Sequence, residues 1–183
     1  MRELWLQLEK NLPPSLKKKL LKASAKTCSG VIVEPKDLEI AKKAEVKVLA
    51  GAVRKELRNK EDLKDLILHV ATPNKAPPSC VIVSCPDWRV IPLENLIAAL
   101  HGKSKLLAEV ADAKEASIAL EALELGVDGV ILETKDESEL TEVSKIVREV
   151  RTRVVEKEEA IQLELAPARS VAVKPLAIGA RAC

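Results

Sequence analysis

Short apolar runs alternate along the chain with segments in which apolar residues recur every three or four positions. The runs predict buried strands at residues 4–8, 31–33, 46–49, 81–83, 106–110 and 130–132. The segments with helical spacing predict helices at residues 16–27, 38–44, 92–100, 113–125 and 138–151. The charged stretch 55–65 predicts a short surface helix, and the alternation at 161–165 and 171–173 is typical of strands.

Capping residues mark where several of these helices begin and end. Ser15, Asp37 and Asp112 stand just before helical segments and are predicted to be N-caps. Gly102 and Gly126 follow helical segments and are predicted to stop them. The regular change from strand to helix therefore predicts a chain of βα units.

The predicted fold class is α/β, with a mostly parallel sheet that forms an incomplete TIM-barrel-like structure or an open sheet. The strands are too uniformly apolar for edge strands, so helices are expected to cover the sheet. The chain has no Phe and no Tyr, and its Trp residues are Trp5 and Trp88, so the core must be aliphatic. The βα-repeat domain is expected to span residues 1–166.

Composition narrows the classes of function. The 183 residues include 30 basic and 28 acidic side chains, a net charge of +2, which argues against a nucleic-acid surface. The scarcity of aromatic residues also removes the platforms on which single-stranded bases stack. No apolar run approaches the roughly 18 residues of a membrane span. A charged N-terminus without an apolar run argues against secretion, so a cytoplasmic protein is expected.

The cysteines and histidines do not form a recognisable site. No C-x-x-C pair occurs among Cys28, Cys80, Cys85 and Cys183, so we expect reduced thiols and no metal. His69 lies in an apolar run and is predicted to be a core residue.

Ligands of parallel α/β proteins gather at the carboxyl ends of the strands. Residues 30–37 and 129–136 resemble each other, and in each segment a glutamate follows directly after the predicted buried strand. These glutamates, Glu34 and Glu133, are candidate substrate-binding carboxylates, as a base or as a partner for an amine. Alternatively, each pairs locally, with Lys36 or Lys135. The similarity itself fits either a duplicated βα unit or the common chemistry of βα corners.

A second candidate cluster follows the predicted strand at residues 81–83. Asp87, Trp88 and Arg89 place a tryptophan between opposite charges, and Glu94 and Asn95 follow on the first turn of a helix. These polar groups are predicted to face the cleft at the strand ends. In the alternative interpretation, Trp88 packs over the strand ends and Asp87 pairs with Arg89. No glycine-rich nucleotide fingerprint occurs in the chain.

Two stretches of sequence resemble the archaeal-type (second type) 3-dehydroquinate synthase family. Residues 87–98, DWRVIPLENLIA, are similar to that family's D-W-x-x-I-P-L-E-N-L-I-A run. Residues 115–132 are similar to its E-A…L-E-x-G-x-D-G-V-x-L pattern. The resemblance covers the N-terminal half of a typical member, and residues 167–183 resemble the start of a C-terminal β-rich domain that is otherwise missing.

The resemblance implies an NAD-dependent oxidoreductase of the shikimate pathway. Its reaction is oxidative deamination of 2-amino-3,7-dideoxy-D-threo-hept-6-ulosonate, followed by cyclisation to 3-dehydroquinate. The residues that match the motif are then expected to be catalytic (Asp87, Glu94 and Asn95) or substrate-binding (Trp88 and Arg89). The NAD site itself is not identified, and a plastid location follows if a transit peptide has been lost.

Two other classes of function are alternatives to the enzyme. One is a truncated, catalytically inactive relic, which the absence of the family's second half favours. The other is a βα module that binds a small ligand, with no nucleic acid or membrane as partner. The intact motif at residues 87–98 favours the enzyme.

Overall fold

The computed structural model describes residues 2–49, 52–71, 77–85, 93–122 and 126–165. Six parallel strands form one sheet in the order β2-β1-β6-β5-β4-β3. The strands are β1 (Glu3–Gln7), β2 (Gly30–Ile32), β3 (Val53–Glu56), β4 (Cys80–Ser84), β5 (Lys105–Val110) and β6 (Gly129–Glu133). The helices are α1 (Pro14–Thr27), η1 (Pro35–Asp37), α2 (Leu38–Lys43), α3 (Lys60–Ala71), α4 (Leu93–Leu100), α5 (Ala113–Glu121) and α6 (Glu137–Leu165).

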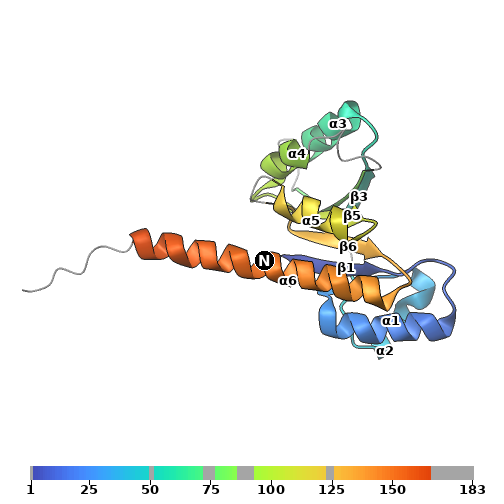
Figure 1. Ribbon diagram of the computed structural model, residues 1–183. Helices are drawn as coiled ribbons and strands as arrows, with labels where there is room; N and C mark the ends of the chain where they lie inside the picture. The colour runs from blue at the N-terminus through green and yellow to red at the C-terminus, as the bar shows by residue number, and fades with distance from the viewer. Residues whose placement is uncertain (1, 50–51, 72–76, 86–92, 123–125, 166–183) are drawn as a thin grey trace, which may run out of the picture.

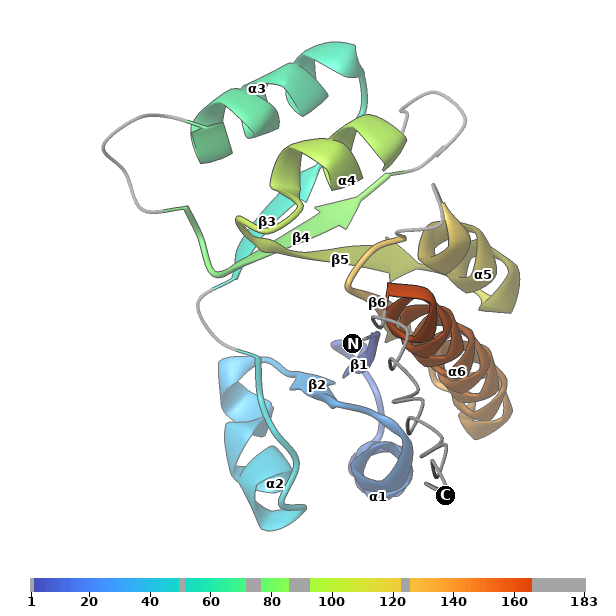
Figure 2. The same cartoon turned by 90° about the vertical axis from the view of Figure 1, so that its left-hand side faces the viewer.

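The sheet is curled, and its first and last strands in the sequence, β1 and β6, are neighbours. Figure 2 shows the helices on the outside of the curve, with α3 and α4 at one end of the strand order and α1 and α2 at the other. The strands β2 and β3 form the two edges, so the expectation that the apolar strands are not edge strands is wrong for β2, which is apolar because Val31 packs in the core on the outer face. The prediction of an α/β fold with an incomplete barrel is therefore confirmed.

Alternation along the strands divides the sheet into two apolar faces. The outer face packs against the helices and forms the larger core, which includes Leu4, Leu6, Val31, Val81, Val83, Leu106, Ala108, Val130 and Leu132. A smaller cluster occupies the concave face and consists of Trp5, Cys80, Ile82, Leu107 and Ile131. The aliphatic core expected from the composition therefore surrounds one buried tryptophan.

Trp5 fills the centre of the concave face and is only 1% exposed. Its indole Nε1 donates a hydrogen bond of 2.9 Å to Glu3 Oε2, and the Lys47 ammonium lies 5.8 Å from the ring centroid. The ring packs against Gly30, where a Cβ atom would come within 2.4 Å of Trp5 Cζ3. Gly30 thus leaves the space that the indole occupies.

The third predicted strand is wrong in position. Residues 46–49 contribute only an isolated parallel bridge between Val48 and Val31, whereas the sheet continues at β3, whose last two residues overlap the stretch 55–65 predicted as a surface helix. The helix in this part of the chain, α3, begins only at Lys60. β3 is a short edge strand in which only one residue of four, Val53, is apolar. An edge strand at the polar mouth of the sheet needs no continuous apolar run, which explains why the pattern missed it.

The last helix is longer than predicted. α6 continues from Glu137 to Leu165, so the predicted end at residue 151 and the predicted strand at 161–165 are both wrong. Residues 152–160 contain no Gly or Pro that would end a helix, and three alternating apolar residues are too short a signal to override that. Figure 1 shows the C-terminal half of α6 extending beyond the sheet. The predicted strand at 171–173 and the predicted boundary at 166 lie outside the described residues.

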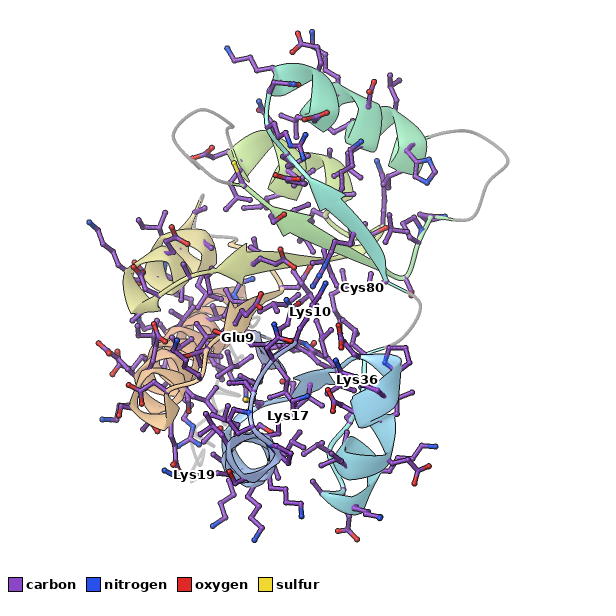
Figure 3. All side chains as sticks on the ribbon, turned by 90° about the vertical axis from the view of Figure 1, so that its right-hand side faces the viewer. Glu9, Lys10, Lys17, Lys19, Lys36 and Cys80 are labelled. Carbon is purple, nitrogen blue, oxygen red and sulfur yellow. The ribbon has the colours of Figure 1, made fainter. Side chains whose placement is uncertain are left out.

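The predicted N-cap at Ser15 is wrong, whereas Asp37 is the N-cap of α2 in position but not through its side chain. Helix α1 begins at Pro14 with Pro13 as its N-cap, so Ser15 lies inside the helix. Asp37 precedes α2 but its side chain makes no capping hydrogen bond. Its Oδ2 instead pairs with Lys17 Nζ at 2.6 Å, and both side chains are less than 10% exposed. In Figure 3, Lys17 lies on the side of α1 toward the sheet, whereas Lys19 lies on the outside.

The predictions for the third N-cap and for two helix-ending glycines are confirmed, whereas the prediction for His69 is wrong. Asp112 caps α5 as predicted, because its side chain accepts a hydrogen bond from the Glu115 backbone N–H. Gly102 and Gly126, which follow α4 and α5, have φ values of +72° and +57°, a conformation that favours glycine. His69 is exposed on α3, so its prediction as a core residue is wrong.

Within the described part of the chain, no helix is long and apolar enough to cross a membrane.

Candidate functional site

A cleft of about 510 Å³ opens at the carboxyl ends of the strands. Its polar lining comes from five of the six strand ends or the residues just after them, together with the first turn of α5. The lining residues are Gln7, Glu56, Ser84, Cys85, Glu109, Val110, Ala111, Glu115, Ile131 and Glu133. This is the edge of a parallel sheet at which α/β proteins bind ligands.

Sheet register explains why these side chains meet. Gln7 lies opposite Glu133 where β1 pairs with β6, and Glu56 lies opposite Ser84 where β3 pairs with β4. Each is the last residue of its strand. Because side chains alternate between faces, the ends that point inward form the floor of the cleft.

A polar network crosses the cleft. Arg54 Nη2 on β3 lies 2.6 Å from Glu109 Oε1 on β5 and also donates to Gln7 Oε1 on β1. Gln7 Nε2 in turn donates to Glu133 Oε2 on β6 at 2.6 Å. Glu109 Oε1 is shielded from solvent and accepts no hydrogen bond of good geometry in the described structure, so the ion pair with Arg54 is what balances its charge. The network therefore connects four strands through one arginine and one glutamine.

Two further lining carboxylates, Glu115 and Glu56, have partners close by in the sequence. Glu115 Oε2 accepts a hydrogen bond of 2.9 Å from the Ala111 backbone N–H, which completes a reciprocal cap at the start of α5. Glu56 pairs with Arg58 Nη2 at 2.6 Å on the exposed rim. Among the lining carboxylates, Glu133 is thus the one with neither a cationic nor a backbone N–H partner in the described structure.

The two glutamates that the sequence singled out are placed differently. Glu133 lines the cleft, next to Gln7. Glu34 is not among the lining residues, and its Oε2 pairs with Lys36 Nζ at 2.5 Å, the local alternative considered for it. The hydrogen bond from Lys36 holds the pKa of the Glu34 carboxyl below its usual value. The structure therefore brings one of the two glutamates to the cleft.

The motif at residues 87–98 is described only in part. Asp87, Trp88 and Arg89 lie outside the described residues. Glu94 and Asn95 are exposed on the first turn of α4, and neither lines the cleft as described. Ser84 and Cys85, which stand three and two positions before this motif, do line the cleft.

Sequence reasoning left Gln7, Arg54, Glu56 and Glu115 out of the site. Arg54 and Glu56 were missed because β3 was missed. Gln7 could have been found as the polar residue next to the carboxyl end of the predicted strand 4–8, by the rule that selected Glu133.

The described cysteines are thiols. Burial raises the pKa of Cys28 to about 11, and burial also raises the pKa of Cys80. Little thiolate forms at these two positions near neutral pH, which argues against their use as nucleophiles. In the described part of the chain, no group of three or more His, Cys, Asp or Glu residues is placed to hold a metal ion.

The described lining does not fit NAD. Four carboxylates line the cleft and would repel the two phosphates of the cofactor. The two nearby cations, Arg54 and Arg58, balance only two of these four charges, so the lining stays net negative toward two phosphates. The first turn of α5 is capped by its own acidic side chains, so it offers no vacant anion site. These residues therefore provide no binding site for NAD.

Comparison with known proteins identifies relatives along most of the chain. The 3-dehydroquinate synthase of Methanothrix thermoacetophila is 39% identical over 132 residues, which are 70% of this chain and 32% of that protein. A 3-dehydroquinate synthase homolog of Aquifex aeolicus is 42% identical over 110 residues, 60% of this chain and 30% of that protein. The 3-dehydroquinate synthase of Methanococcus maripaludis strain C7 is 34% identical over 155 residues, 84% of this chain and 40% of that protein.

The matched segments therefore amount to about a third of the length of these curated relatives. Among solved structures, a triosephosphate isomerase from Bartonella henselae aligns with 81% of this chain at 10% identity and a TM-score of 0.48, too low to carry an argument. The family model described as the 3-dehydroquinate synthase II N-terminal domain matches residues 1–147, which include all six strands and the cleft between them. By this match, the chain belongs to the 3-dehydroquinate synthase II family.

Proposed function

We propose that this chain supplies the amine-binding part of a 3-dehydroquinate synthase in aromatic amino acid biosynthesis. The proposed reaction is NAD-dependent oxidative deamination of 2-amino-3,7-dideoxy-D-threo-hept-6-ulosonate, followed by ring closure to 3-dehydroquinate. The names of the relatives support the product and the pathway. The observation that carries the proposal for this chain is the position of Glu133 in an acidic cleft at the carboxyl ends of the strands.

Glu133 is proposed to receive the substrate amine. The amine is an ammonium group at neutral pH and must lose a proton before the carbon that bears it is oxidised. Gln7 donates to Glu133 Oε2 and orients the carboxylate, which leaves Oε1 for the ammonium. Glu109 and Glu115 are less suited, because Arg54 and the backbone of α5 already hold them.

The motif residues remain proposed substrate-side groups. Asp87, Trp88 and Arg89 follow Cys85, which lines the cleft, within four positions of the chain. Glu94 and Asn95 are kept with them because they belong to the same motif. No individual role is assigned to these five residues.

A second candidate function is binding without efficient turnover by this chain alone. The poor fit of the described lining to NAD favours it, because a chain that holds the substrate but not the cofactor cannot oxidise it at a useful rate. In this interpretation the chain is a module that binds the amino-ulosonate. The two candidates make different predictions for NADH formation and the same prediction for substrate binding.

Glu133→Gln is expected to weaken both substrate binding and any turnover. If the purified 183-residue chain forms NADH from NAD and the amino-ulosonate, the variant is expected to lower kcat by about 100-fold or more, because general-base catalysis contributes about that much. If the chain does not turn over, isothermal titration calorimetry should still show binding by the native chain and weaker binding by the variant.

The matched control is Glu142→Gln, the same change at an exposed position on α6 away from the cleft. It is expected to behave as the native chain in both assays. Native binding and native kcat in Glu133→Gln would refute the role of Glu133. Absence of substrate binding by the native chain would refute the proposed function itself.

A further inference from the structure

Arg54 makes contacts that its position in the sheet does not require. It lies on the edge strand β3, whose only neighbour in the sheet is β4. Its guanidinium contacts no residue of β4 in these two interactions, but Glu109 on β5 and Gln7 on β1. This side chain thus extends across the mouth of the cleft from its edge.

Some N–H donors of the Arg54 guanidinium are not used by these two contacts. Both contacts use Nη2, and Nη1 and Nε have no partner in the described part of the chain. An arginine carries five N–H donors in a planar fork that matches a carboxylate. The Arg54 side chain is 46% exposed, so the remaining donors are accessible to a ligand.

The charge of the cleft makes such a donor necessary for the proposed substrate, which carries a carboxylate as well as an amine. Four glutamates line the cleft and favour the ammonium end. The same glutamates repel the carboxylate end unless a cation receives it. To recognise an amino acid, the cleft therefore needs one cationic side chain close to the glutamate that binds the substrate amine.

We propose that Arg54 binds the substrate carboxylate through a free N–H of Nη1 or Nε and thereby determines specificity for an amino carboxylate over a simple amine. The proposal rests on the proposed function, since it concerns the same cleft. Gln7 supports it geometrically, because this one side chain contacts both Arg54 and Glu133. The two ends of the substrate are then received by residues that a single glutamine connects.

Arg58 provides a matched comparison. It also pairs with a lining carboxylate, Glu56, but that contact is local and lies on the exposed rim, with the Arg58 side chain 70% exposed. It reaches neither β5 nor β1 in the described structure. Loss of Arg58 removes the same charge near the cleft without removing the donors that face across it.

The test measures dissociation constants by calorimetry for two probes. One is the amino-ulosonate, and the other is its analogue with a hydroxymethyl group in place of the carboxylate. Arg54→Gln is expected to raise the Kd of the amino-ulosonate by about 10- to 100-fold, the range for a lost charged hydrogen bond, and to leave the Kd of the analogue unchanged. Arg54→Lys should restore part of the affinity, because it keeps the charge but not the separate donors that let one side chain hold Glu109, Gln7 and the ligand together.

Each other outcome overturns the proposal. Native affinity of Arg54→Gln for the amino-ulosonate would show that Arg54 does not bind the carboxylate. An equal loss for both probes would show a merely structural role, and an equal loss in Arg58→Gln would show a general effect of charge. If the native chain binds neither probe, the proposed function fails as well, which distinguishes that result from the first three.

Discussion

Lys17→Met is expected to lower the free energy of unfolding by about 3–5 kcal/mol, the usual cost of removing one partner from a buried ion pair. Lys17 Nζ lies 2.6 Å from Asp37 Oδ2, and the two side chains are 7% and 9% exposed. Without the ammonium, the Asp37 carboxylate stays buried between α1 and the start of α2 with no compensating charge. The measurement is urea unfolding followed by circular dichroism.

Two further variants make this prediction specific. Lys18→Met changes the exposed neighbour on the same helix and is expected to alter the stability by less than about 0.5 kcal/mol. The double variant Lys17→Met/Asp37→Leu should recover most of the loss, because an apolar pair replaces both charges. A loss below about 1 kcal/mol in Lys17→Met would mean that the pair is solvated in solution.

Trp5→Ala is expected to cost about 3–5 kcal/mol, as for other fully buried large side chains. The indole fills the concave face between Ile82, Leu107 and Ile131, and no other aromatic residue in the described structure shares that space. Its removal also leaves Glu3 Oε2 without the hydrogen bond from Nε1. The same unfolding titration measures the loss.

Trp5→Phe separates the two contributions, because it keeps most of the packing and removes only the donor. We expect it to cost less than half of the loss in Trp5→Ala. Ile118→Ala, a truncation at a position that is 54% exposed on α5, is the surface control and should cost less than about 0.5 kcal/mol. Similar losses in Trp5→Ala and Ile118→Ala would contradict a packed concave face.

The strands were predictable from the sequence where burial requires a continuous run of apolar residues. β2, β4, β5 and β6 are covered on the outer face by helices and read as continuous apolar runs. β3 was not predictable in this way, because an edge strand at a polar mouth carries Arg54, Lys55 and Glu56. The segment 46–49 reads as a strand because Val48 packs on β2, although one bridge is all the pairing it makes.

The site was predictable only through the strands that were found. Glu133 follows directly from the rule that ligands meet strand ends, whereas Arg54 and Glu56 needed a strand that the pattern did not reveal. Glu34 shows the limit of that rule. It comes two residues after β2, an edge strand that contributes no residue to the cleft lining, and its carboxylate pairs with Lys36 instead.

The central claim is that the substrate binds at the carboxyl ends of the strands, and amide chemical-shift mapping of the native chain tests it most directly. Addition of the amino-ulosonate to the ¹⁵N-labelled chain is predicted to shift the amide signals of Gln7, Ser84, Glu109 and Glu133. Signals at the opposite end of the sheet, such as that of Ser104, should stay in place. Shifts confined to the opposite end, or no shifts at saturating ligand, would contradict the account.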